Sequence, residues 1–333
     1  MANEVVRDEH VEACLSGGGS MGELMRSIEW SKTPIGAVET WSPTLRAMIS
    51  FLLANRFPLL LWWGPDYTSI YNDAYRPILG KKHPHALGQS VRECWSEIWD
   101  VLQPLIDVPF NGGPATWMDD ISLEINRHGY VEETHFTIAY SPVPDETEPR
   151  GIGGVLATVH EITEKTIADR RVLLLRDLAS KTAEARSTEE ACAIAASILS
   201  QYPKDVPFAL LYLIDADRKR ARLAGAVGVL VGEAASPMMV DLDRQNGHEQ
   251  VWPLADVVRQ GALQRIENLS QNVAKVPPGP WSEVNGPSQV PFISLAAESA
   301  EMPCMCCGSC GCWARTAVAL TTIRATASRL RFM

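Results

Sequence analysis

A long stretch without glycine or proline divides this sequence in two. It runs from Ile162 to about Ala185 and consists mainly of strong helix formers. Strand and helix signals occur on both sides of it, and a chain of 333 residues is long enough for two domains. We therefore expect two folded domains joined by a connector helix over residues 162–186.

The residues before this helix predict an α+β domain. Apolar or alternating runs bounded by turn residues predict strands at 57–64, 67–72, 117–126, 130–141 and 153–161. Helices are expected from about Met21, from Pro43, over 72–80 and over 92–106. This order predicts a five-stranded antiparallel sheet with helices on one face.

The residues after the connector predict a second, less regular domain. A capping sequence at Ser187 opens a helix, and strands are expected at 207–215 and 220–228. Beyond Glu283 the strand pattern is lost, no acidic residue follows Glu301, and cysteines crowd into positions 304–312. We interpret residues 283–333 as an irregular cysteine-rich tail produced by a shift of reading frame. A genuine disordered tail is the alternative.

Charge and hydropathy exclude several classes of protein. The formal net charge of −10 argues against a nucleic-acid partner. No run approaches the ~18 apolar residues of a membrane-spanning helix, and the acidic N-terminus does not have the pattern of a secretory signal. The scattered cysteines before the tail suit a reducing compartment. We expect a cytoplasmic protein with no membrane span and no nucleic-acid partner.

Four short motifs in the first domain occur together in a known family. They are Trp-Ser-x-Thr-Pro-x-Gly at 30–36, Tyr-Asn-Asp-x-Tyr-Arg at 71–76, Gly-Lys-Lys-His-Pro at 80–84 and Ser-Pro at 141–142. With them, residues 20–165 resemble the sensory PAS domain of bacterial hybrid sensor histidine kinases. Residues 170–280 are similar to the GAF domain that follows in those proteins, on the basis of domain order and one helix–strand–strand pattern.

The resemblance implies domain boundaries and a function. It implies a PAS sensory domain at 21–161, the connector as a signalling helix, and an incomplete GAF-like α/β-sheet domain at 187–282. The polar residues 1–20, which end in Ser-Gly-Gly-Gly-Ser, by themselves predict a disordered leader. The implied function is the signal-sensing input of a two-component phosphorelay. The state of a ligand or partner would pass through the helix to a histidine kinase.

We expect the kinase itself to be missing from this chain. His160-Glu161-Ile162 looks like the start of a phosphoacceptor box, but Thr163 and Glu164 follow where that box has Arg and Pro. Phosphoryl transfer needs positioned phosphate and metal ligands, and the sequence offers no such set. We therefore expect no catalytic residue and no activity of the chain on its own, although the family is one of histidine kinases.

A PAS-like sheet and its helices can enclose a small apolar cavity for a ligand. The candidate lining residues are all aromatic: Trp62, Tyr71, Tyr75, Trp95 and Trp99. The alternative is that these rings only fill the core. The sequence does not identify a cofactor.

The connector helix has two possible partners. Its apolar residues fall near heptad spacing at Ile167, Leu174, Leu178 and Ala185, which favours a homodimer through this helix. The alternative is that the helix packs on the domain that follows it.

The tail offers a different class of function. Cys304, Cys307 and Cys310 could supply thiolate ligands to a metal ion. The chain would then be a metal-binding regulator rather than a sensory input.

Overall fold

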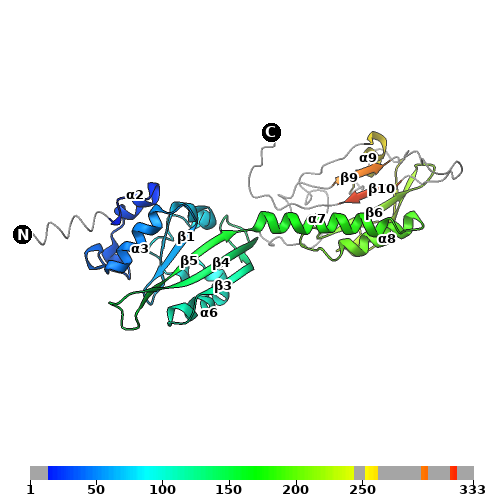
Figure 1. Ribbon diagram of the computed structural model, residues 1–333. Coiled ribbons are helices and arrows are strands. Elements are labelled where there is room, and N and C mark those ends of the chain that lie inside the picture. The colour runs from blue at the N-terminus through cyan, green and yellow to red at the C-terminus, as the bar shows by residue number, and fades with distance from the viewer. Residues whose placement is uncertain (1–13, 244–251, 262–293, 299–315, 321–333) are drawn as a thin grey trace, which may run out of the picture. The chain divides into compact units, whose positions relative to one another are not determined.

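The computed structural model describes residues 14–243, 252–261, 294–298 and 316–320 (Figure 1). The chain forms two compact units that meet between Thr166 and Ile167. Each unit has its own sheet, and each is described by itself below.

The first unit is built around a five-stranded antiparallel sheet, as the sequence predicts. Its strands are β1 (Leu59–Trp63), β2 (Thr68–Tyr71), β3 (Thr116–Ile125), β4 (Glu132–Pro144) and β5 (Ile152–Glu161). The spatial order is β2-β1-β5-β4-β3, so the first and last predicted strands lie side by side in the middle of the sheet. The expected hairpin of β1 and β2 is confirmed by their antiparallel pairing.

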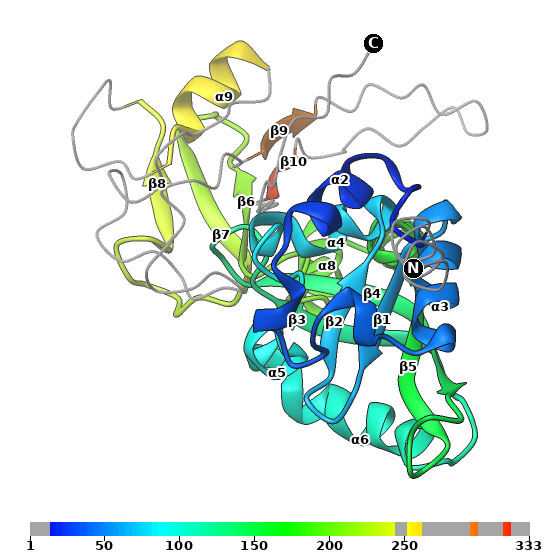
Figure 2. The same cartoon turned by 90° about the vertical axis from the view of Figure 1, so that its left-hand side faces the viewer.

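Helices cover this sheet from both sides, so the expectation of helices on one face is wrong. The α-helices are α2 (Gly19–Ser27), α3 (Pro43–Ala54), α4 (Arg76–Leu79), α5 (Val91–Cys94) and α6 (Trp99–Phe110). The short 3₁₀ turns are η1 (Trp30–Lys32), η2 (Val38–Thr40), η3 (Asp73–Tyr75), η4 (Gly80–Lys82) and η5 (Ser96–Ile98). α6 packs on β3, β4 and β5 (Figure 2).

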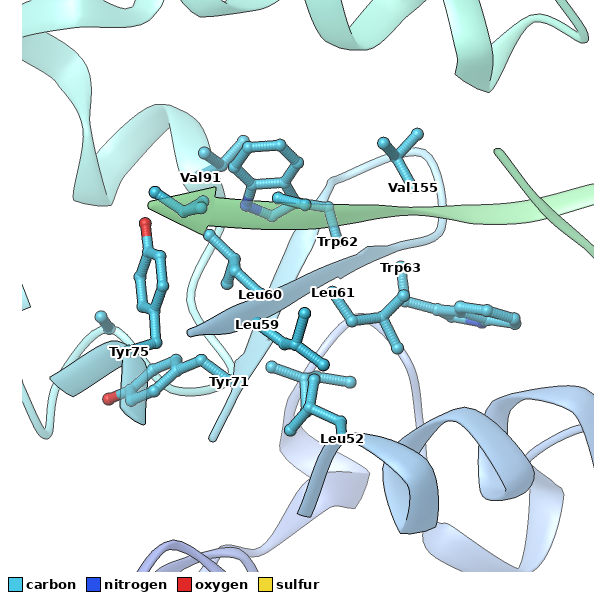
Figure 3. Packing of buried hydrophobic residues seen from close by; sticks show 14 of the residues in the cluster. Leu52, Leu59, Leu60, Leu61, Trp62, Trp63, Tyr71, Tyr75, Val91 and Val155 are labelled. Atoms are coloured by element: carbon cyan, nitrogen blue, oxygen red, sulfur yellow. The ribbon is translucent and has the colours of Figure 1, made fainter. Parts of the chain in front are cut away.

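The strand β1 shows why two layers of helices are needed. All five of its side chains are buried, although neighbouring residues of a strand point to opposite faces. In Figure 3, Leu60 and Trp62 point to one side of β1, whereas Leu59 and Leu61 point to the other side, toward Leu52 of α3. A strand that is apolar on both faces must be covered on both.

The predicted helix over 92–106 is interrupted in the structure. α5 ends at Cys94, Trp95 leaves the helical region with φ −117° and ψ 40°, and α6 begins only at Trp99. The carbonyl oxygen of Cys94 accepts a hydrogen bond from the Lys82 ammonium, and the Ile98 N–H bonds to the Trp95 carbonyl instead. A side chain distant in sequence thus takes the carbonyl that an uninterrupted helix would use.

The second unit contains a five-stranded sheet in the order β8-β7-β6-β10-β9. Its strands are β6 (Ala209–Ile214), β7 (Arg220–Val227), β8 (Met239–Asp241), β9 (Ser294–Glu298) and β10 (Thr316–Leu320). Its helices are α8 (Thr188–Leu199) and α9 (Leu254–Gln260), and α7 (Thr163–Thr182) enters it from the first unit.

Two of these strands lie in the segment interpreted as an irregular tail. β10 pairs with β6 and with β9, so residues beyond 283 contribute to the second sheet. The prediction that strand structure ends near residue 282 is therefore wrong for these two segments. The cysteines between 304 and 312 lie outside the described residues. The shift of reading frame stays a prediction.

Within the described part of the chain, no helix is both long and apolar enough to cross a membrane.

Candidate functional site

A small apolar cavity lies between the sheet of the first unit and the helices on its α6 side. Its volume is about 30 Å³, which is room for little more than one water molecule. Aromatic and aliphatic side chains from β1, α4, α6 and the three late strands enclose it, and no charged side chain lines it. The site therefore favours a small uncharged occupant.

The structure brings three of the five predicted aromatic residues together at this cavity. Trp62, Tyr75 and Trp95 line it. Tyr71 points elsewhere and shares a hydrogen bond with Nδ1 of His83 at 2.9 Å. Trp99 packs beside Tyr67, with 6.1 Å between the ring centroids. In Figure 3 the hydroxyl of Tyr75 lies on the Trp62 side of β1, whereas that of Tyr71 points away from β1.

Sequence reasoning missed most of the aliphatic wall and the late strands. The additional lining residues are Ile78, Ile98, Leu102, Leu123, Ile125, Phe136, Ile138, Tyr140 and Val159. The alternation of Phe136, Ile138 and Tyr140 in β4 was a usable signal, because residues two apart on a strand share a face. Which of its two faces would border a cavity is decided by the strand order, which periodicity does not give.

The polar atoms of the cavity leave one donor without a partner. Nε1 of Trp62 is buried and has no hydrogen-bond acceptor in the structure. The hydroxyl of Tyr75 has a partner in the side chain of Trp95. Burial raises the pKa values of Tyr75 and Tyr140, so both phenols stay neutral at ordinary pH. An occupant with one acceptor atom could satisfy the indole N–H of Trp62.

Lys82 packs against Trp95, one of the residues that line the cavity. Its ammonium lies 4.5 Å from the ring centroid of Trp95 and binds both carboxylate oxygens of Glu97 at 2.8 and 3.0 Å. Burial alone would raise the pKa of Glu97, but hydrogen bonds from Lys82 and from the Asn126 N–H outweigh it and lower that pKa. Since Glu97 is therefore ionised at neutral pH, it fixes Lys82 over the wall of the cavity.

A second constellation lies where the sheet passes into α7. Arg127, in the loop after β3, donates two hydrogen bonds to the carboxylate of Glu161 at 2.7 and 2.8 Å. Glu161 is the last residue of β5 and also accepts a hydrogen bond from the hydroxyl of Thr163. That hydroxyl in turn accepts from the backbone N–H of His135 in β4 at 2.9 Å. A two-point guanidinium–carboxylate pair fixes orientation as well as distance.

A contact between two backbone segments links the cavity wall to this junction. Ile78 lines the cavity, and two residues further on Gly80 begins η4. A Cβ atom at Gly80 would come within 2.5 Å of the Arg127 carbonyl oxygen, and the N–H of Lys81 donates to that oxygen at 2.7 Å. The backbone just after α4 is thus in direct contact with the backbone of Arg127, whose side chain pairs with Glu161.

Beyond the junction, α7 packs within the second unit. Leu174 is buried and Leu178 half-buried in a cluster with Ile198, Leu199 and Val206. Arg171 and Arg170 both bind the buried carboxylate of Asp205. The packing of the helix on the following domain therefore accounts for Leu174 and Leu178, which the sequence offered as a dimer seam.

A different face of α7 is left exposed. Ala168, Val172, Leu175 and Ala179 are all exposed and follow one another at spacings of four, three and four residues. This is the spacing of the apolar seam in a two-stranded coiled coil.

The structure does not describe the cysteines that the sequence suggests as metal ligands. Cys304, Cys307 and Cys310 lie outside the described residues, and the described part of the chain holds no group of three or more His, Cys, Asp or Glu side chains arranged for a metal ion.

No protein-family model and no curated protein matches the sequence. Among solved structures, the chain is similar to a sensory box sensor histidine kinase from Vibrio cholerae, at 18% identity and a TM-score of 0.25, over 35% of this chain and 88% of that chain. An RNA-binding light-oxygen-voltage receptor is matched at 15% identity and a TM-score of 0.30, over 44% and 41% of the two chains. The chromophore-binding domain of a Stigmatella aurantiaca bacteriophytochrome is matched at 11% identity and a TM-score of 0.25, over 81% and 87%. TM-scores this low do not establish a shared fold, and we base no inference on these matches.

Proposed function

We propose that the first unit is a signal-sensing input module whose state passes through α7 to a histidine kinase of a two-component phosphorelay. The observation that carries the sensory part is the chain of contacts from the cavity wall at Ile78, through Gly80 and Arg127, to Glu161 at the end of β5, two residues before α7. The kinase as output rests on the resemblance of residues 20–165 to the PAS domains of sensor kinases.

The signal is proposed to be a small uncharged molecule that binds in the cavity. Alternatively, a partner could rearrange the side chains that line it. The cavity holds too little space for a planar cofactor without moving its walls. An occupant that pushes α4 outward would shift the balance between two positions of the Arg127–Glu161 pair. Binding energy that differs between the two positions is what a signal of this kind requires.

The output helix is proposed to pair with a second copy of the chain. The exposed seam of Ala168, Val172, Leu175 and Ala179 supports this proposal, because apolar side chains at heptad spacing are buried when two such helices meet. The seam is apolar, whereas Arg170 and Arg171 of the same helix bind Asp205. One helix can therefore pair with a second copy through the seam while these arginines hold it to Asp205.

A substitution that fills the cavity can stand in for the unidentified occupant. Leu102→Phe adds three carbon atoms to the wall from α6. We expect it to change the hydrogen-exchange rates of the Ile162 and Thr166 amides by about threefold or more, because those amides bond to His135 and Ile162 at the start of α7. Hydrogen exchange on the full chain measures this.

Two further variants make the test specific. Leu105→Phe adds the same atoms on the same helix but outside the cavity wall, so it should leave these amides unchanged. In an Arg127→Lys background, which keeps the charge but loses the two-point pairing, the effect of Leu102→Phe should disappear. Equal effects of the two phenylalanines, or an undiminished response in the lysine background, would contradict the proposal.

A further inference from the structure

A second cavity lies on the other face of β1. Because neighbouring strand residues point to opposite faces, Trp62 lines the first cavity and Trp63 lines the second (Figure 3). The volume of the second cavity is about 200 Å³. An engineered cavity of about 150 Å³ in another protein takes up benzene, so this one has room for a small organic molecule.

The lining of this cavity includes both aromatic rings and carboxylates. Trp41 and Trp63 contribute indole rings, and Asp66, Asp145 and Glu148 contribute carboxylates. No lysine, arginine or histidine is among its lining residues. The π faces of indoles attract cations, and the carboxylates give the cavity a negative potential.

The two tryptophans are held in place by their surroundings. The indole N–H of Trp41 donates to the carbonyl of Gly36 at 3.0 Å. Gly153 of β5 allows Trp63 and Asp145 to approach each other, since a Cβ there would come within 2.5 Å of the Trp63 ring and 2.8 Å of Asp145 Cβ. The ring and the carboxylate therefore form one preorganised wall.

Asp145 is the most deeply buried of the three carboxylates that line the cavity. Only 2% of its surface is exposed. Its carboxylate accepts from the hydroxyl of Ser42 and from the N–H and hydroxyl of Thr147, at 2.9 and 2.7 Å for Thr147. Burial alone would raise the pKa of Asp145, but these hydrogen bonds outweigh it and lower that pKa. All three donors are neutral, and no ion pair to Asp145 occurs among the residues that the structure describes.

A buried carboxylate that is ionised beside an open cavity favours a cation in that cavity. Burying a charge is costly unless an opposite charge compensates it. A metal ion would need several oxygen ligands in a close shell, whereas the described residues hold no group of three or more His, Cys, Asp or Glu side chains arranged for a metal ion. Aromatic rings with a few carboxylates suit a cation that carries apolar groups.

We propose that this cavity binds a small organic cation of the quaternary ammonium class, with its charge beside Asp145 and its methyl groups against Trp41 and Trp63. This site is distinct from the cavity of the proposed function and does not depend on it. It would give the same β1 strand a second ligand, on the opposite face from Trp62.

Choline and its neutral isostere 3,3-dimethylbutan-1-ol test the proposal on the full chain at physiological ionic strength. Calorimetric titration should show saturable binding of choline at one site per chain and binding of the alcohol at least about tenfold weaker. Asp145→Asn should weaken choline binding by a similar factor. Since Asp145 also holds Ser42 and Thr147, the double variant Asp66→Asn/Glu148→Gln removes the other two carboxylates of the lining without touching those bonds, and it should also weaken choline binding.

The neighbouring carboxylate of Glu146 provides the matched control. It is exposed in the same loop but does not line the cavity. Glu146→Gln should leave choline affinity unchanged. Failure of choline to bind, equal binding of the neutral alcohol, or an equal loss in Glu146→Gln would overturn the proposal.

Discussion

At the scale of single residues, Asn72 holds more of the first unit together than any local pattern suggests. Its side-chain amide donates to the carbonyls of Leu52, Asn55 and Phe57 at 3.2, 3.1 and 2.7 Å. Its side-chain oxygen accepts from the N–H groups of Leu59 and Tyr75 at 3.1 and 3.2 Å. One buried side chain therefore ties the end of α3 to the start of β1 and caps η3.

Replacing Asn72 by alanine should be strongly destabilising. Three carbonyl groups and two N–H groups would lose a partner at a position where only 1% of the residue is exposed. We expect a loss of about 2–4 kcal/mol in the free energy of unfolding, measured by urea unfolding followed with tryptophan fluorescence. Asn111→Ala removes two hydrogen bonds of an exposed asparagine, one to the Asp107 carbonyl and one from Arg150, and should cost less than about 0.5 kcal/mol. Similar losses for both variants would refute this account.

The sequence predicts part of this role and misses the rest. Asn72 and Asp73 both have the chemistry of helix caps, and Asn72 does cap the turn that follows it. Asp73 instead accepts hydrogen bonds from the hydroxyl of Ser20 and the N–H of Met21, at the start of α2. Local spacing predicts that a residue can cap a helix, whereas the fold decides which helix it reaches.

At the scale of elements, α7 shows how periodicity can identify a helix without deciding which partner each of its faces contacts. Its extent follows from the absence of glycine and proline. Its apolar residues form two stripes, however, and only the position of Asp205 and of the α8 residues shows which stripe is buried. The break at Trp95 has a similar cause, because Lys82 reaches the Cys94 carbonyl from another element.

The exposed stripe of α7 yields a prediction about assembly. Leu175 is 65% exposed, so Leu175→Glu removes nothing from the core but places a charge in the proposed dimer seam. We expect the wild-type chain to sediment as a dimer and the variant as a monomer, because a buried charge at a seam position opposes pairing. Sedimentation equilibrium over a range of concentrations distinguishes these states.

Leu173→Glu is the matched control for the seam. Leu173 is also exposed, but it lies one residue away from Val172 and therefore on a different side of the helix. This variant should remain a dimer. A monomeric wild-type chain, or dissociation by both substitutions alike, would argue against the seam.

At the scale of the whole molecule, the sequence separates the two units but does not determine the extent of the second. The helical stretch between two sets of strands predicts the division, because each set can bury its own apolar residues. β9 and β10 escaped prediction because each is only five residues long and contains two alanines, a residue that strands disfavour. The volume of the cavity in the first unit could not be predicted from the sequence either, since it depends on how the side chains of Trp62, Trp95 and Tyr140 pack together.

Separate cores predict separate unfolding. Ile49 is fully buried in the core of the first unit, and Phe208 is fully buried in a core of the second. Calorimetry of the full chain should show two transitions, because the two units have separate clusters of buried apolar residues. Ile49→Ala should lower the midpoint of one transition by roughly 5–15 °C and Phe208→Ala that of the other, since each substitution costs about 2–5 kcal/mol in a unit of this size. A single transition whose midpoint both substitutions lower would mean that the two cores unfold cooperatively. α7 would then be a rigid helix that couples the two units, rather than a connector that can change its state.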